Sequence, residues 1–175
     1  GCGAGSKVCK GYYGWLGDRR APEGKGALRV SWSRELTPAR RGAYRPVEHA
    51  VAAVDAERGR IYVGAESGQL FALGTDGHPL YRFELHEAIA SEPTLDPAKQ
   101  ELYFGTERGE LYAMDASMGK ILWRKEGDAA IRQQPVLLPD AVLVITEEDA
   151  IEAFSRADGR LLWRYAREPL EGFLV

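Results

Sequence analysis

The stretch IYVGAESGQLFALGTDGHPLYRF, residues 61–83, decides the fold because the chain repeats it twice more. The second copy is LYFGTERGELYAMDASMGKILWRK at residues 102–125, and the third is VLVITEEDAIEAFSRADGRLLWRY at residues 142–165. Equivalent positions in successive copies lie 40 to 42 residues apart. A fixed period of this length is typical of a solenoid, a propeller or another repeat array, so we expect one structural unit built three times.

Each copy reads as short β-strands that are joined by turns ending in glycine. In the second copy, apolar runs at residues 102–104, 111–114 and 121–123 are separated by turns that end in Gly109 and Gly119. Glycine supplies the positive φ that such turns need, which is typical of antiparallel hairpins. The pattern therefore predicts three consecutive antiparallel strands in each copy.

A fourth strand is expected ahead of these three. Short apolar runs with a proline near their start occupy residues 93–95 and 135–138, and proline is tolerated at the first position of a strand. Four antiparallel strands in about forty residues form one β-propeller blade, and no helical stripe of ten or more residues occurs after position 50. We predict an all-β propeller of four-stranded antiparallel blades, with about three complete blades and an earlier last-strand candidate at residues 28–32.

The last strand of each copy carries a large aromatic residue, which is Tyr81, Trp123 or Trp163. A ring at one fixed place in each blade is suited to pack against the neighbouring blade. The second copy has the pattern A-x-D-x-x-x-G-K-x-x-W at residues 113–123; the third has Ser155 at the aspartate position, and the first is one residue shorter. This pattern resembles the tryptophan-docking repeat of the pyrroloquinoline quinone (PQQ)-like β-propellers, over roughly residues 50–175.

The resemblance implies structural roles for the repeated residues rather than chemical ones. In PQQ-like propellers the alanine, glycine and aromatic positions lock each blade to the next. The residues that match these positions are Ala72, Gly77, Tyr81, Ala113, Asp115, Gly119, Trp123, Ala153, Gly159 and Trp163.

Two functional branches share this repeat. One is the quinone-dependent dehydrogenases, which hold the quinone and Ca²⁺ at the centre of an eight-bladed propeller. The other is non-enzymatic and includes the BamB family of lipoproteins, which belong to the outer-membrane β-barrel assembly machinery. Propellers close with about four to eight blades, so we expect this chain to be the N-terminal part of a longer seven- or eight-bladed protein; the alternative is that partial propellers assemble with one another.

The chain begins with a basic leader. Residues 1–47 hold ten Lys and Arg against three Asp and Glu, whereas residues 48–175 hold thirteen against twenty-three. An acidic propeller argues against nucleic acid as its partner. This basic segment is expected either to lie on anionic lipid headgroups or to act as a solvated tether. We place the boundary between the leader and the partial propeller inside it: the leader covers residues 1–27, and the partial propeller covers residues 28–175.

Gly1-Cys2 has the form of the end of a bacterial lipobox, in which the cysteine is acylated. We therefore expect lipid attachment at Cys2, and a periplasmic protein anchored to the outer membrane by this lipid alone. The alternative is that Cys2 and Cys9 are paired or free. No apolar run approaches the eighteen or so residues that a spanning helix needs.

No catalytic constellation is found. The resemblance implies that a quinoprotein enzyme would show a general-base aspartate, a Ca²⁺ site and adjacent cysteines, whereas Cys2 and Cys9 are neither adjacent nor inside the propeller. The aspartates lie in turns, where the side chain bonds its own backbone. The three histidines lack the paired spacing of metal sites. We predict no cofactor, no metal and no enzymatic activity in this segment.

What remains is a binding surface on the loops that join one blade to the next, at residues 85–92 and 127–134. Each loop places an isoleucine four residues before a proline. In the BamB family, loops of this class contact the partner barrel protein. The predicted partner contacts are Glu87, Ile89, Ile131 and Arg132; the alternative is that both isoleucines pack into the core between blades.

The sequence thus predicts a non-enzymatic scaffold lipoprotein that assists the assembly of outer-membrane β-barrel proteins through its propeller loops. One alternative is part of a PQQ-dependent dehydrogenase whose active site lies in further blades, and another is a ligand-sensing propeller.

Overall fold

The computed structural model describes residues 31–34 and 51–166. The chain divides into two compact units, Gly1–Ser33 and Arg34–Val175. All twelve strands of the described residues belong to the second unit, and these residues contain no helix that could cross a membrane. Residues 31 and 32, the described end of the strand candidate at 28–32, are not in a strand.

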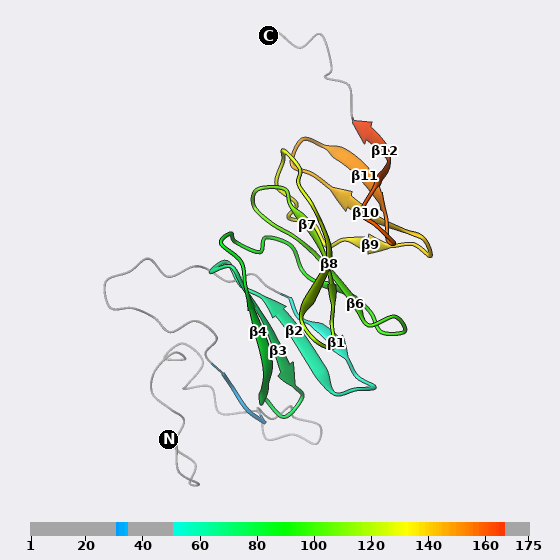
Figure 1. The fold of residues 1–175 in the computed structure, drawn as a ribbon. Helices are drawn as coiled ribbons and strands as arrows, with labels where there is room; N and C mark the ends of the chain where they lie inside the picture. The colour runs from blue at the N-terminus through cyan, green and yellow to red at the C-terminus, as the bar shows by residue number, and fades with distance from the viewer. Residues whose placement is uncertain (1–30, 35–50, 167–175) are drawn as a thin grey trace, which may run out of the picture. The chain divides into compact units, whose positions relative to one another are not determined.

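The twelve strands form three four-stranded antiparallel sheets, and each sheet keeps its strands in chain order (Figure 1). The first sheet contains β1 (Ala53–Asp55), β2 (Arg60–Gly64), β3 (Gln69–Gly74) and β4 (Pro79–Glu84). The second contains β5 (Thr94–Asp96), β6 (Glu101–Gly105), β7 (Leu111–Asp115) and β8 (Lys120–Lys125). The third contains β9 (Val136–Leu137), β10 (Ala141–Ile145), β11 (Ala150–Ser155) and β12 (Leu161–Ala166). The predicted all-β fold of four-stranded blades is confirmed, and we call these sheets the first, second and third blades.

Local chemistry explains why the blades share one shape. Gly109 and Gly119 have φ values of 85° and 71°, a region that costs other residues free energy, so glycine ends the turn as the sequence indicated. Each blade also has an irregularity in register at the same place, directly after Ala72, Ala113 and Ala153. A bulge of this kind bends the strand and increases its twist.

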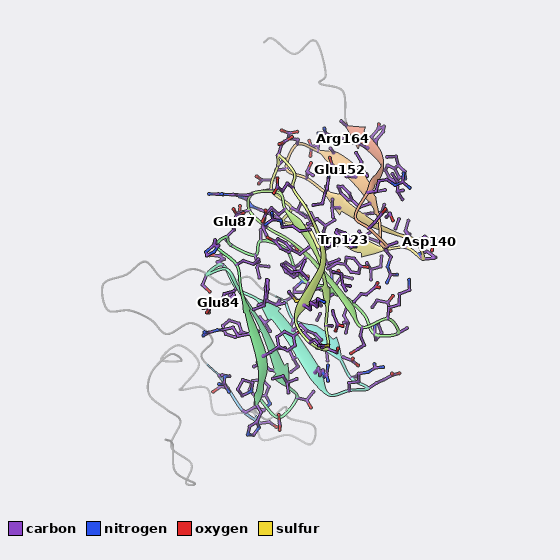
Figure 2. The ribbon with its side chains drawn as sticks, in the orientation of Figure 1. Glu84, Glu87, Trp123, Asp140, Glu152 and Arg164 are labelled. Atoms are coloured by element: carbon purple, nitrogen blue, oxygen red, sulfur yellow. The ribbon has the colours of Figure 1, made fainter. Side chains whose placement is uncertain are left out.

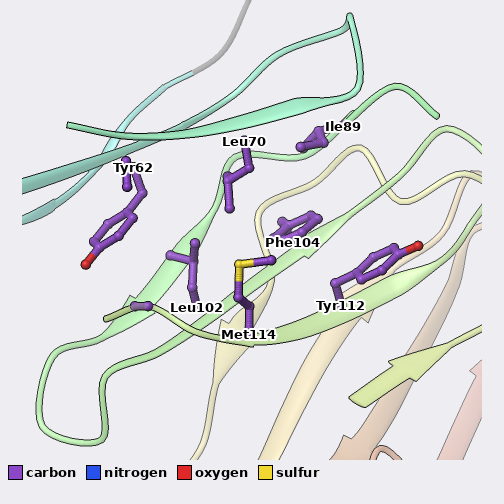
Figure 3. Close-up of a cluster of buried hydrophobic side chains, with 9 residues drawn as sticks. Tyr62, Leu70, Ile89, Leu102, Phe104, Tyr112 and Met114 are labelled. Atoms are coloured by element: carbon purple, nitrogen blue, oxygen red, sulfur yellow. The ribbon is translucent and has the colours of Figure 1, made fainter. Parts of the chain in front are cut away.

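The hydrophobic core lies between successive blades. The cluster between the first and second blades (Figure 3) includes the stacked rings of Phe104 and Tyr112, whose centroids are 5.2 Å apart. The first blade and the loop after it contribute Tyr62, Leu70, Ala72 and Ile89; the second blade contributes Leu102, Phe104, Tyr112, Met114 and Ala116. Burial of this apolar surface is the main favourable term that holds the blades together.

The second blade is buried on both faces. Successive strand residues point to opposite faces, so Leu102 packs toward the first blade while its neighbour Tyr103 belongs to the cluster shared with the third blade. That second cluster contains Tyr103, Leu111, Ala113, Ile131, Val142, Val144 and Phe154. This two-sided burial explains the near-continuous apolar runs in β6 and β7.

Tyr81, the large ring of β4, packs on the glycine turn of the second blade. The Tyr81 hydroxyl donates a hydrogen bond of 2.8 Å to the carbonyl of Ala116. A Cβ placed on Gly119 would lie 2.7 Å from the Tyr81 ring. Only glycine therefore lets the turn approach the ring so closely.

Trp123 repeats this arrangement at the next interface. Its indole Nε1–H donates to the carbonyl of Arg156 at 2.8 Å, and a Cβ on Gly159 would lie 2.6 Å from the ring. The rings of Tyr81 and Trp123 therefore pack against the neighbouring blade, and at both interfaces they do so on a glycine turn, which the sequence had not indicated. The corresponding ring of the third blade, Trp163, is 48% exposed, and its docking role stays a prediction.

The other repeated positions also have defined surroundings. The three alanines, Ala72, Ala113 and Ala153, are completely buried. Gly77 has a φ of 84°, and its carbonyl accepts a hydrogen bond from Arg34. Asp115 accepts hydrogen bonds from the backbone N–H groups of residues 117 and 118. Hydrogen bonding, first of all from Ser117, lowers the pKa of its carboxyl group.

Candidate functional site

One edge of the blades gathers the loops that were predicted to bind a partner. The β2–β3, β6–β7 and β10–β11 turns lie at this edge together with the interblade loops at residues 85–92 and 127–134, and we call it the loop rim. Backbone hydrogen bonds hold each loop to its own blade: Ile89 N–H donates to Ala65 O at 3.3 Å, and Ile131 N–H donates to Thr106 O at 3.1 Å. The loop rim is therefore tied to the sheets at equivalent points.

Each loop is also tied to the blade that follows. Glu107 N–H donates to Ala88 O at 3.1 Å, and Glu147 N–H donates to Ala130 O at 3.0 Å. The same bond thus recurs at the two interfaces, forty residues apart. A loop held at both sides presents its exposed side chains in fixed positions.

The two predicted isoleucine contacts are buried. Ile89 is 4% exposed and Ile131 is 2% exposed, as in the packing alternative. A Cβ on Gly105 would overlap the Ile131 side chain, and one on Gly64 would lie 2.6 Å from Ile89 Cγ2. The expectation that these isoleucines contact a partner is corrected accordingly, because the apolar side chain gains more by filling the gap over glycine than by facing water.

Arg132 is half-exposed on the loop rim and binds two glutamates. It forms a bidentate pair with Glu107, with Nη2 2.7 Å from Oε2, and its Nη1 contacts Glu147. Hydrogen bonding to Glu107 raises the pKa of the guanidinium further. Exposed ion pairs contribute little to stability because water screens them, so this pair fixes the position of Arg132 more than it stabilises the fold.

Glu87 lies on the preceding loop. Its Oε1 is 2.8 Å from Nη1 of Arg108, and the glutamate side chain is 16% exposed. Its other oxygen is buried without a hydrogen-bond partner among the described residues. The ion-pair partners of Glu87 and Arg132 were not predicted from the sequence. For Arg132 the recurrence of glutamate at positions 66, 107 and 147 of equivalent turns was a signal.

A second polar cluster, on the opposite edge, was also missed. Arg156 is 8% exposed and contacts Asp96 and Glu101, with Nη2 2.6 Å from Glu101 Oε2. Its Nε donates to the hydroxyl of Tyr103 at 3.2 Å. Burial, followed by the hydrogen bond to Glu101, raises the pKa of Tyr103 to about 12. The cluster joins the second and third blades, and Arg156 hydrogen-bonds both carboxylates and the Tyr103 hydroxyl, so it fits a structural role.

The other aspartates of the described ranges that have perturbed surroundings are engaged within their own turns or with a neighbouring side chain. The carboxylates of Asp76 and Asp96 accept hydrogen bonds from backbone N–H groups of their own turns. Asp55 is buried, and the hydrogen bond from Gln100 is the largest cause of its lowered pKa. No group of three or more metal-binding side chains occurs in the ranges that the structure describes. Cys2, the predicted lipid attachment residue, lies outside those ranges.

Comparisons with known proteins agree with this arrangement. Residues 97–173 match the family model described as outer membrane protein assembly factor BamB. The outer membrane protein assembly factor BamB of Shewanella oneidensis is 32% identical over 68 residues, which cover 39% of this chain and 17% of that protein.

Among solved structures, BamB from Moraxella catarrhalis matches with a TM-score of 0.63 and 21% identity, over 74% of this chain and 38% of that one. A quinohemoprotein alcohol dehydrogenase from Pseudomonas putida matches with a TM-score of 0.61 and 19% identity, over 69% of this chain and 20% of that one. The chain thus spans well under half the length of these proteins, and the structural likenesses support the fold alone. The three blades have the β-propeller fold, and their sequence repeat resembles the PQQ-like repeat of the outer membrane protein assembly factor BamB.

Proposed function

We propose that this chain is part of a non-enzymatic scaffold that assists the assembly of outer-membrane β-barrel proteins. The observation that carries the proposal is the match of residues 97–173 to the BamB family model, together with the sequence likeness to a BamB protein over 68 residues. Both concern sequence rather than fold, and many unrelated functions share the propeller fold.

The loop rim supports this role because it can hold side chains rigidly for a protein partner. The interblade loops are hydrogen-bonded to the blades on either side, so they lose little conformational freedom on binding, and such preorganisation favours affinity. Arg132 is the candidate contact with the best-defined position, because Glu107 and Glu147 both hold it. Arginine is enriched among the residues that dominate protein interfaces.

Binding to a purified barrel-assembly protein of the same organism tests the proposal. Biolayer interferometry would compare the unmodified chain with Arg132→Glu and with Arg160→Glu. Arg160 is an exposed arginine in the β11–β12 turn, on the edge opposite the loop rim. Arg160→Glu is therefore a control with the same change in charge. We expect Arg132→Glu to weaken binding on the order of tenfold or more and Arg160→Glu to have little effect. Absence of binding by the unmodified chain, or equal losses in both variants, would refute the proposal.

We further propose that Cys2 carries the lipid that anchors the protein to the outer membrane, in the periplasm. The support is the Gly1-Cys2 pair at the start of a glycine-rich basic leader. Mass spectrometry of the membrane-extracted protein should show acyl chains on Cys2, and Cys2→Ala should release the protein from the membrane fraction. An unmodified Cys2 in the native protein would contradict the anchor.

A PQQ-dependent dehydrogenase is the second candidate function, because the fold also resembles that of a quinohemoprotein alcohol dehydrogenase. Titration of PQQ with Ca²⁺ into the full-length protein, followed by absorbance and dye reduction with alcohols, separates the candidates. Saturable binding with turnover would favour the dehydrogenase and refute the scaffold.

A further inference from the structure

A cavity of about 140 Å³ opens between the second and third blades at the loop rim. The segment 125–129 lines one side of it, and Thr146, Glu148, Glu152 and Arg164 line the other. Figure 2 shows Glu152 and Arg164 next to each other on β11 and β12. The volume is far more than a single ordered water requires.

The cavity arises from a difference between the repeats. At the interface of the first and second blades, the corresponding space is filled by the stacked rings of Phe104 and Tyr112 (Figure 3). Forty residues later, Val144 and Glu152 occupy the equivalent positions. Val144 remains in the buried core between these blades, whereas Glu152 lines the cavity and makes its wall acidic where the second blade has the ring of Tyr112.

The wall of the cavity carries excess negative charge. Glu126, Asp128, Glu148 and Glu152 supply four carboxylates against the two lining cations Lys125 and Arg164, and Glu126 is also paired with Arg124, whose Nη2 lies 3.0 Å from Oε1. Arg164 lies 3.2 Å from Oε2 of Glu148 and 3.2 Å from Oε1 of Glu152, so these pairs engage one oxygen of each carboxylate. Asp128 forms no ion pair with any residue that the structure describes. Carboxylate oxygens are therefore left over for a cationic ligand.

A buried hydroxyl at the same cavity has no partner. Thr146 is 8% exposed, and its Oγ1 makes no hydrogen bond within the described part of the chain. In the second blade the equivalent hydroxyl, that of Thr106, accepts a bond of 3.1 Å from Glu110 N–H. A buried polar group that is left unpaired destabilises the fold, and a ligand with N–H donors would supply the missing hydrogen bond.

A guanidinium group combines the properties that the cavity requires. It is planar and always charged, and it has five N–H donors and no acceptor. The same rim shows how this protein binds such a group, because Arg132 lies between Glu107 and Glu147 with bidentate geometry. We propose that the cavity binds an arginine side chain of a protein partner, which interacts with Glu152, Glu148 and Asp128 and donates to Thr146. That a protein partner supplies this arginine rests on the scaffold function proposed above.

Titration of the full chain with N-acetylarginine amide, followed by NMR of the backbone amides, tests the site itself. We expect saturable shifts confined to residues 125–129 and 146–152, and no saturable shift with the uncharged analogue N-acetylcitrulline amide. Glu152→Gln should weaken binding at least fivefold. Asp140→Asn, the same loss of charge on the β9–β10 turn away from the cavity (Figure 2), should leave binding unchanged.

Two further variants keep the test decisive. Val144→Phe combined with Glu152→Tyr restores the ring pair of the second blade and should abolish binding. Asp128→Asn changes an exposed residue of the interblade loop, so it should weaken binding even if the filled variant does not fold. Absence of saturable shifts, equal binding of the citrulline analogue, or tighter binding of inorganic phosphate at the same amides would overturn the proposal.

The outcomes also separate this site from the scaffold role. If a barrel-assembly protein binds and Arg132→Glu weakens it while the arginine amide does not bind, the cavity proposal fails and the scaffold stands. If the amide binds at the cavity and no assembly protein binds, the site is retained and the proposed function fails.

Discussion

Replacement of Trp123 offers the sharpest prediction about how one blade holds the next. The ring packs on Gly159, and its Nε1–H donates to Arg156 O at 2.8 Å. Trp123→Phe keeps an aromatic ring but removes this donor and leaves the carbonyl unpaired, which should reduce the free energy of unfolding by about 1 kcal/mol. Trp123→Ala also loses the ring contacts. Replacement of a fully buried tryptophan by alanine lowers the free energy of unfolding by about 3–5 kcal/mol. Because Trp123 is only partly buried, we expect Trp123→Ala to lower it by about 2–3 kcal/mol.

Urea unfolding of the 175-residue chain, followed by far-ultraviolet circular dichroism, measures both values. Trp163→Phe is the matched control, because this ring has the same place in the third blade but is 48% exposed, and a substitution there should stay within about 0.5 kcal/mol. The reasoning is refuted if Trp123→Phe is no more destabilising than Trp163→Phe, or if Trp123→Ala costs less than about 1 kcal/mol.

Three other substitutions test separate contacts. Gly105→Ala should destabilise by about 1–3 kcal/mol, because the new Cβ overlaps Ile131; thermal melts should show that Ile131→Ala partly compensates for it, and additive losses would contradict the close contact. Arg156→Met should flatten the pH dependence of stability between about pH 5 and about pH 3. Burial opposes ionisation of Asp96, but the hydrogen bond from Arg156 leaves the pKa of its carboxyl group below 3.8. The pair therefore stabilises the fold above pH 3.8, and this stabilisation is lost as the pH falls through the pKa of Asp96 in the folded protein. If urea unfolding of Arg156→Met shows the same dependence of the unfolding free energy on pH as the unmodified chain, the pair does not have this role. Asp115→Ala should cost about 1 kcal/mol in the same urea assay, because two backbone N–H groups of the turn lose their acceptor, and an unchanged midpoint would contradict this role.

The period of the repeat was enough to predict the blades. The turns that end in Gly109 and Gly119 were predicted from glycine position, and both glycines have positive φ. Gly105, at the end of β6, is glycine for a different reason, the close approach of Ile131. The repeat pattern alone does not reveal this contact between a strand and a separate loop. For this reason Ile131 could be assigned either to the core or to the surface until its surroundings were seen.

The candidate site was predicted less completely than the fold. The interblade loops were located from the proline spacing, but the pairing of Arg132 with Glu107 and Glu147 depends on how two blades meet. The cavity was missed for a related reason. The change from Tyr112 to Glu152 is visible in aligned repeats, yet it produces a hollow only because both residues face the preceding blade.

The most direct test of the account is the distance between the Trp123 ring and Gly159 in solution. A Cβ at Gly159 would lie 2.6 Å from ring atom Cε3, so the α-proton that takes its place points at the indole ring. NMR should show strong nuclear Overhauser effects between this proton and the Trp123 ring, with an upfield ring-current shift of the Gly159 signal. A Gly159 signal at its random-coil position, without such effects, would contradict the claim that consecutive blades are joined ring to turn.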